Sequence, residues 1–183
     1  MTRSLLTVLT CFILLISSCS TVKKTVAESE PPKTRTGTMP APSKAKTFRK
    51  PLKIDRYEFV SFAKTLLGTP YKYGSANPDD GLDCSGFISF VFGHFNVKSP
   101  RSSVSFTNEG EDIDPDEARS GDIILFTGSD HASGIVGHMG IITKAGKPMQ
   151  FIHSASGKNI GVILNSLTGY YKNHFVKVIR ILE

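Results

Sequence analysis

The sequence predicts an α+β fold, with helices in the first half of the chain and strands in the second. Between residues 55 and 95, large apolar side chains recur every three to four residues, the period of a helix's buried face. From residue 122 onward, short runs of β-branched and aromatic residues alternate with Gly, Pro, Asn and Ser. Because no internal repeat is visible, the 183 residues should form one domain with a tail.

Two helices are expected in the first half. Ordered structure should begin near Ile54, where Asp55 and Glu58 form a D-x-x-E capping pattern, and Gly68 should follow the end of this helix. A second helix is expected over residues 84–95, where buried-face spacing resumes after a turn-rich stretch.

A sheet of five mostly antiparallel strands should follow, with the helices packed on it. A short helix capped by Ser102 or Ser103 and an acidic loop over residues 112–120 lead into the sheet. Because the connections between the later runs are short, neighbouring strands should be antiparallel. The expected strands are residues 122–127, 136–143, 148–154, 160–164 and 175–182.

The N-terminus has the features of a bacterial export signal. Arg3 precedes an apolar run over residues 5–16, too short to span a bilayer as a stable helix, and small residues lead to Cys19. The sequence Ile-Ser-Ser-Cys resembles a lipobox, so residues 1–18 should be removed and Cys19 should carry a lipid that tethers the protein to a membrane. An ordinary signal peptide or a single short anchor is the alternative. Ser20 follows Cys19 at the position where an aspartate is the usual signal for retention in the inner membrane of diderm bacteria. The resemblance therefore implies an outer-membrane lipoprotein facing the periplasm.

The net charge of +6 is concentrated in one segment. Residues 19–50 carry eight Lys and Arg against two Glu, whereas residues 51–183 carry thirteen basic and fourteen acidic side chains. The first segment is also rich in proline and poor in large apolar residues, so we expect a disordered tether before a folded domain over residues 51–183. Its charge would be solvated or attracted to anionic lipid or cell-wall polymer, and it gives no indication of nucleic-acid binding.

Cys84 is the one thiol expected to remain free after processing. Cys11 lies in the signal and Cys19 would carry the lipid, so no disulfide is expected in the monomer. For a lone cysteine, a small buried apolar side chain is the ordinary interpretation. Cys84, however, is expected in the first turn of a helix, where unpaired N–H groups and the helix dipole favour a thiolate. It is therefore a candidate nucleophile.

Strand register should bring two of the five histidines together. If residues 136–143 and 148–154 are joined by a connection of even length, paired residues have numbers that sum to 293. His138 and His153 then share a face as diagonal neighbours, with Cβ atoms somewhat under about 7–8 Å apart. A connection of odd length would place them on opposite faces, and unrelated histidines on a half-exposed sheet are the alternative. His94 and His174 are interpreted as surface residues, and His131 is unassigned.

A thiol at a helix N-terminus and two histidines on one sheet face are the parts of a cysteine hydrolase. The thiolate attacks an amide or ester carbonyl, one imidazole carries the proton, and a third polar group fixes the tautomer of that imidazole. Helix N–H groups and a hydroxyl such as that of Tyr73 could stabilise the oxyanion. The same three side chains could bind zinc, but no tight pair such as H-x-x-x-H accompanies them. We therefore expect no metal and no other cofactor.

Several short motifs occur in order along residues 55–183. They are Tyr73-Gly74, Asp83-Cys84-Ser85-Gly86-Phe87, Pro100-Arg101-Ser102, Gly121-Asp122, Gly137-His138-Met139-Gly140-Ile141 and Phe151-Ile152-His153. Together they resemble the NlpC-type bacterial cell-wall cysteine peptidases. The resemblance implies a papain-like α+β fold and hydrolysis of peptide bonds in the stem peptides of peptidoglycan. The bond cut is typically that between D-glutamate and diaminopimelate or lysine, or in some members a cross-link.

The resemblance also assigns roles. Cys84 matches the nucleophile, His138 the base, His153 the residue that orients the base, and Tyr73 the tyrosine that helps stabilise the oxyanion. Further matching positions are substrate-binding candidates: Asp83 and Ser85, where some members bind the free amino end of the stem peptide, and Arg101, for which a structural role is an equal alternative.

Two other functions remain open from the sequence. An inactive member could serve as a wall-binding or scaffolding lipoprotein, although the intact Cys84, His138 and His153 argue against it. An amidase or acyltransferase of the same fold could act on another amide or thioester. The loop over residues 129–134 is longer than expected and could shape or cover the cleft.

Overall fold

The fold is described for residues 47–157 and 161–183 from a computed structural model. The export signal expected over residues 1–18 and the lipidation expected at Cys19 lie outside this part of the chain, as does the expected tether up to residue 46. Within the described residues, no helix combines the length and apolar character needed to cross a bilayer.

Both predicted helices are confirmed, and each begins at an aspartate cap. Helix α1 (Arg56–Thr65) starts where the side chain of Asp55 accepts a hydrogen bond of 2.8 Å from the backbone N–H of Glu58. Helix α2 (Cys84–His94) starts where the side chain of Asp83 accepts one of 2.6 Å from the N–H of Gly86. These bonds satisfy N–H groups that have no partner within the helix.

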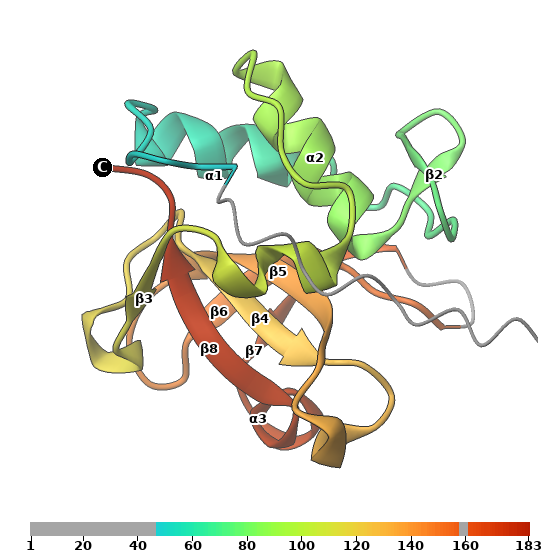
Figure 1. Ribbon diagram of the computed structural model, residues 1–183. Coiled ribbons are helices and arrows are strands. Elements are labelled where there is room, and N and C mark those ends of the chain that lie inside the picture. Colours follow the sequence, from blue (N-terminus) through green and yellow to red (C-terminus); the bar gives the residue numbers. More distant parts are fainter. Residues whose placement is uncertain (1–46, 158–160) are drawn as a thin grey trace, which may run out of the picture. The chain divides into compact units, whose positions relative to one another are not determined.

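The main sheet has six antiparallel strands rather than the five predicted, although the α+β class is confirmed (Figure 1). The additional strand lies in the stretch expected to be an acidic loop. It is a charged edge strand with one buried residue, Ile113, so its sequence lacks the apolar pattern of a strand. From edge to edge the strands are β3 (Glu111–Ile113), β8 (Phe175–Arg180), β4 (Ile123–Thr127), β5 (Val136–Lys144), β6 (Gln150–Ser154) and β7 (Val162–Ser166).

Smaller elements connect the helices and the strands. Strands β1 (Ala76–Asn77) and β2 (Gly81–Leu82) form a two-stranded sheet just before α2. The predicted short helix after residue 102 is confirmed as a 3-10 helix, η1 (Ser103–Asn108). Two further 3-10 turns and one short helix were not predicted: η2 (Pro115–Glu117), η3 (His131–Ser133) and α3 (Gly169–Asn173).

The pairing of β5 with β6 agrees with the prediction in the part of the strands next to His138 and His153. Ile141 pairs with Ile152, which gives the expected sum of 293. Close to the turn, however, Lys144 pairs with Gln150, so the connection itself is odd in length. A register shift between these pairs absorbs the difference and restores the alternation that places both histidines on one face.

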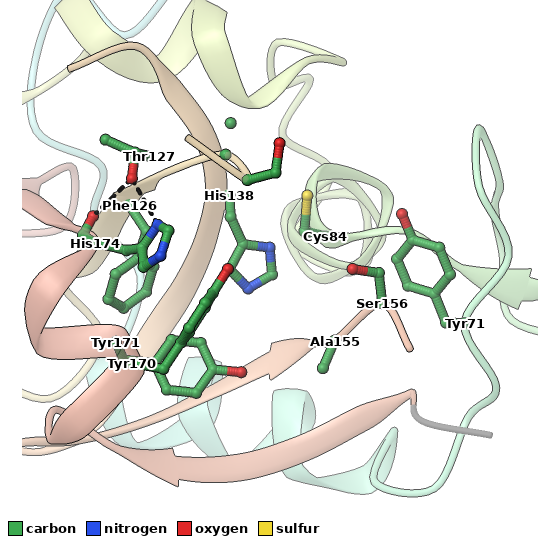
Figure 2. A pocket seen from close by; sticks show the side chains of 13 residues that line it. Tyr71, Cys84, Phe126, Thr127, His138, Ala155, Ser156, Tyr170, Tyr171 and His174 are labelled. Carbon is green, nitrogen blue, oxygen red and sulfur yellow. Dashed lines mark hydrogen bonds between the residues drawn. The ribbon is translucent and has the colours of Figure 1, made fainter. Parts of the chain in front are cut away.

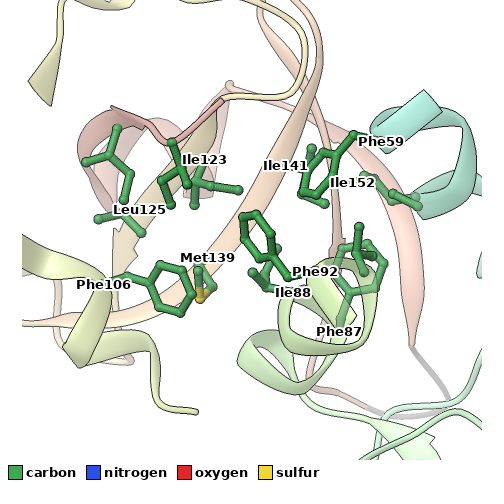
Figure 3. Packing of buried hydrophobic residues seen from close by; sticks show 14 of the residues in the cluster. Phe59, Phe87, Ile88, Phe92, Phe106, Ile123, Leu125, Met139, Ile141 and Ile152 are labelled. Atoms are coloured by element: carbon green, nitrogen blue, oxygen red, sulfur yellow. The ribbon is translucent and has the colours of Figure 1, made fainter. Parts of the chain in front are cut away.

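Helices α2 and α1 lie on the same side of the sheet (Figure 1), and their apolar residues pack with those of the strands (Figure 3). The apolar stripe of α2, formed by Phe87, Ile88 and Phe92, is fully buried with Met139 and Ile141 of β5. Burying each such side chain contributes roughly 1.5–3 kcal/mol relative to leaving it in water. This packing fixes the position of the helix N-terminus relative to the strands.

The first described residues pack on the domain, within the segment expected to be tether. The Phe48 ring lies 5.3 Å from that of Phe92 and 6.3 Å from that of Phe106, measured between ring centroids. The buried carboxylate of Glu109 accepts hydrogen bonds of 2.8 and 2.9 Å from the backbone N–H groups of Thr47 and Phe48. Residues from Thr47 onward are therefore part of the packed structure.

A fully buried carboxylate, Asp122, joins α1, β4 and β8. It accepts hydrogen bonds of 2.8 Å from the guanidinium groups of both Arg56 and Arg180 and from the backbone N–H of Arg119. The Arg56 guanidinium also donates to the carbonyl oxygens of Leu182 and Glu183, so the same cluster holds the C-terminus. Removal of the carboxylate would leave two half-buried cations without their anion.

We predict that Asp122→Ala lowers the free energy of unfolding by about 3–5 kcal/mol, because breaking a buried pair leaves uncompensated charge. The control is Asp116→Ala, which removes an exposed ion pair to Lys147 and should cost less than about 1 kcal/mol. Urea unfolding of both variants measures the difference, and equal losses would contradict the structural role of Asp122.

Candidate active site

The start of α2 positions Cys84 against the small β1–β2 sheet. A Cβ atom at Gly86, in the first turn of the helix, would clash with the backbone carbonyl oxygen of Ser75. Only glycine allows the helix and this loop to approach so closely. The Cys84 side chain is thereby held at the mouth of the cleft instead of inside the apolar core.

The local geometry of β5 turns His138 away from the helix side of the sheet. Met139 packs toward α2, so its neighbour His138 points to the opposite face, beside Phe126. A bulge at Gly137 shifts the pairing with β4 just before this histidine. A Cβ atom at Gly137 would lie 2.6 Å from the Cα atom of Gly128, so the bulge requires glycine.

The predicted meeting of the two histidines is confirmed. His138 Nε2 lies 2.6 Å from His153 Nδ1, and the His153 ring is completely buried beside Phe151 and Tyr171. His153 Nε2 in turn lies 3.0 Å from the side-chain amide nitrogen of Asn165 on β7. Since Nε2 of His138 is occupied by this contact, Nδ1 is the nitrogen available to Cys84.

Cys84 lies between His138 and Tyr71 and opens onto cavities on two sides (Figure 2). The first cavity, of about 280 Å³, continues past His138 to Tyr171 and His174. The second, of about 450 Å³, is lined by Asp83 and Arg101 among others. Gly128 and Ser129, at the start of the long loop noted in the sequence, line the first cavity. An extended chain could therefore pass over the thiol with groups bound on both sides.

Tyr71, which the sequence analysis did not select, lies beside the thiol (Figure 2). Tyr71 lines both cavities, and its pKa is raised by burial and by the neighbouring Cys84 and Asp83. Tyr73, the residue chosen from the motif, is 89% exposed at the rim of the second cavity. A backbone bridge between Tyr71 and Leu82 holds Tyr71 close to the start of α2, and the Tyr-x-Tyr spacing in the sequence does not reveal this contact.

The three substrate-binding candidates bind one another. The Arg101 guanidinium donates two hydrogen bonds to the carboxylate of Asp83, at 3.0 and 2.7 Å, and a third of 3.0 Å to the hydroxyl of Ser85. Burial opposes ionisation of Asp83, but the hydrogen bonds from Arg101 and Gly86 hold its pKa below the ordinary value. The second cavity thus contains an ion pair with its cation partly exposed to solvent.

His153 is fully buried, whereas Cys84 and His138 are half-buried, and burial disfavours the charged form of all three groups. Burial raises the pKa of Cys84, the Asp83 charge raises it further, and the N–H groups of Ser85 and Cys84 only partly offset them. The N–H groups at the helix start favour the thiolate, as expected, but burial and the Asp83 charge outweigh them and the pKa of the Cys84 thiol is raised. Burial lowers the pKa of His138 to about 4. Burial, together with the electrostatic effect of the adjacent His138, lowers the pKa of His153 to about 3.

His174 is buried, so its interpretation as a surface residue is wrong. Its Nδ1 atom lies 2.8 Å from the hydroxyl of Thr127, and its ring stacks on Tyr170 with centroids 4.0 Å apart. The missed helix α3 brings it inward. His94 is exposed as expected and stacks on Phe62, and the exposed ring of His131 lies beside His174.

Among residues 47–157 and 161–183, no group of three or more His, Cys, Asp or Glu side chains could hold a metal ion.

A helix-borne cysteine beside a histidine pair on an antiparallel sheet defines a papain-like α+β protein. The NlpC/P60 family model matches residues 68–180, and the chain belongs to this family.

Three similar proteins illustrate the relationship. Gamma-DL-glutamyl hydrolase of Bacillus subtilis (strain 168) is 30% identical over 122 residues, which are 67% of this chain and 29% of that protein. A probable endopeptidase of Haemophilus influenzae is 34% identical over 116 residues, which are 62% of this chain and 67% of that protein. The crystal structure of an NlpC/P60 family protein from Bacillus cereus aligns with a TM-score of 0.64 at 26% identity, covering 72% of this chain and 42% of that one. The chain thus spans less than half the length of both Bacillus proteins.

The buried histidines predict loss of stability in acid. An unfolded histidine has a pKa of about 6.5. Since the folded values are about 4 and 3, the unfolded state binds protons first and the free energy of unfolding falls as pH drops from about 6.5 to 4. Urea unfolding across this pH range should show a smaller fall in the free energy of unfolding for His153→Gln than for wild type. His94→Gln, on the surface, should show the wild-type dependence on pH. A wild-type pH dependence in His153→Gln would contradict the lowered pKa of His153.

Proposed function

We propose that this protein is a peptidoglycan endopeptidase that hydrolyses an amide bond of a stem peptide or cross-link through Cys84. The observation that carries the proposal is the thiol itself, exposed to two cavities beside the His138–His153 pair. The relatives named as a glutamyl hydrolase and a probable endopeptidase support the reaction class.

In the proposed mechanism, His138 acts as the base for Cys84. As the sulfur bonds to the substrate's carbonyl carbon, the thiol proton moves to His138 Nδ1 and the carbonyl electron pair moves to oxygen. The resulting imidazolium donates its other proton toward His153 Nδ1, at the observed separation of 2.6 Å. Since thiol and imidazole are both neutral at rest, proton transfer accompanies attack instead of preceding it.

Collapse of the tetrahedral adduct breaks the carbon–nitrogen bond. The amine leaves with the proton held on His138, and the acyl group remains on Cys84 as a thioester. Water then attacks the thioester while His138 takes one of its protons, and collapse returns that proton to the departing sulfur. The backbone N–H of Cys84 and the hydroxyl of Tyr71 are the donors that we assign to the oxyanion.

Membrane attachment is a further part of the proposal. We infer that a lipid on Cys19 holds the domain on the periplasmic side of the outer membrane, where peptidoglycan is within reach. Cys19 and the tether from residue 19 to residue 46 lie outside the described residues, and the mass of the mature N-terminal peptide tests the inference.

Cys84→Ala should abolish release of fragments from purified peptidoglycan and leave the fold intact, because the side chain supplies chemistry more than packing. Mass spectrometry of the muropeptides released by wild type identifies the bond that is cut. If neither protein releases fragments under reducing conditions but both bind the wall, the endopeptidase proposal fails and a scaffolding role replaces it.

Tyr71→Phe should reduce kcat by roughly 10²-fold with little change in KM, because it removes one donor to the oxyanion. Tyr73→Phe is the matched control and should change kcat by less than about twofold, since its ring is exposed at the rim. Steady-state hydrolysis of a stem peptide measures both. A larger loss of kcat in Tyr73→Phe than in Tyr71→Phe would contradict this assignment and indicate that Tyr73 stabilises the oxyanion.

A further inference from the structure

Asn165 continues the line of hydrogen-bonding groups that starts at Cys84. It lies on β7 directly opposite Phe151 of β6, so its side chain and that of His153 are on the same face of the sheet. Its amide nitrogen is 3.0 Å from His153 Nε2, which is the side chain's one hydrogen bond among the described residues. The order of groups is therefore Cys84, His138, His153 and Asn165.

The chemistry of this line depends on where two protons reside. For His138 to accept a proton at Nδ1, its own proton must be on Nε2 and point at His153 Nδ1. The proton of His153 must then be on Nε2, where it needs an acceptor. The reverse arrangement places a proton on His138 Nδ1, where it blocks the uptake of the thiol proton.

We propose that Asn165 is a positioning residue that sets the tautomers of both histidines. A carboxamide can present either its oxygen or its nitrogen to the same position by a half-turn of its terminal torsion. With Oδ1 toward His153 Nε2, both histidines take the tautomer in which His138 is a base. With Nδ2 in that place, as the structure records it, both take the opposite tautomer. Rotation of one amide thus switches the site between a resting and a base-competent state.

The base-competent arrangement also stabilises the charged intermediate. When His138 becomes an imidazolium, its Nε2–H donates to His153 Nδ1, and the Nε2–H of His153 donates to Asn165 Oδ1. The dipoles of both hydrogen bonds are then oriented so that they stabilise the positive charge on His138. The His153 side chain is fully buried from bulk solvent, so the acceptor at its Nε2 atom is a protein group. This proposal rests on the proposed function for its consequence in catalysis, but the tautomers exist in the resting protein.

Two substitutions separate the roles of Asn165. Asn165→Asp provides only an acceptor, so it should fix the base-competent tautomer, keep kcat within about threefold of wild type, and move the acid limb of the pH profile upward. Asn165→Leu has a similar size and no acceptor, and it should lower kcat roughly 10-fold or more at unchanged KM. Leu164→Asp is the control, since it adds the same charge on the neighbouring, exposed position of β7 that faces away from the histidines.

The direct readout is nitrogen-15 NMR of the histidine rings in the full, unliganded protein. Wild type should show the resting tautomer, as the recorded Asn165 orientation implies, or exchange between the two; Asn165→Asp should show the base-competent tautomer alone, and Leu164→Asp should match wild type. Identical ring spectra in wild type, Asn165→Asp and Asn165→Leu would overturn the proposal. Because this measurement uses no substrate, it can support the tautomer switch even if peptidoglycan is not cleaved, and it can refute the switch in an active enzyme.

Discussion

The packing of α2 on the sheet is the constraint on which the site depends. Phe87, Ile88 and Phe92 fix the helix against β5, and the close approach at Gly86 fixes its first turn. Cys84 is half-buried and packs against this core, so its position is set by the core. If Cys84 is the nucleophile, as proposed, a thiol held in this way needs little reorganisation when a substrate carbonyl arrives.

The opposite face of the sheet carries His138, the base in the proposed mechanism. The bulge at Gly137 and the alternation along β5 direct His138 to the face where His153 is buried among aromatic rings. Burial raises the pKa of the Cys84 thiol and lowers the pKa values of both histidines, so it disfavours charge on all three groups. In the proposed mechanism, proton transfer therefore accompanies attack, and the donors around Cys84 act on the charge that develops.

The parts of the molecule that follow from local chemistry could be predicted from the sequence. Asp55 and Asp83 begin helices because an aspartate followed by a helical period is a cap, and the strand alternation brought His138 and His153 to one face. The parts that depend on contacts between distant segments could not. Strand β3 exists only because β8 pairs with it, and the placement of Tyr71 instead of Tyr73 beside the thiol depends on a bridge to Leu82. Likewise, the predicted pairing near the two histidines holds only because the register shifts between Ile142 and Lys144, and no residue pattern in the sequence reveals this shift.

The most direct test of a Cys84-based hydrolase is to trap its acyl intermediate with a second nucleophile. Hydrolysis of a stem peptide in the presence of hydroxylamine should convert a growing share of the acyl product into the hydroxamate as the hydroxylamine concentration rises, because a thioester partitions between hydroxylamine and water. The account predicts this product for wild type and none for Cys84→Ala. Efficient cleavage by wild type with no hydroxamate at any concentration would contradict an acyl-enzyme on Cys84.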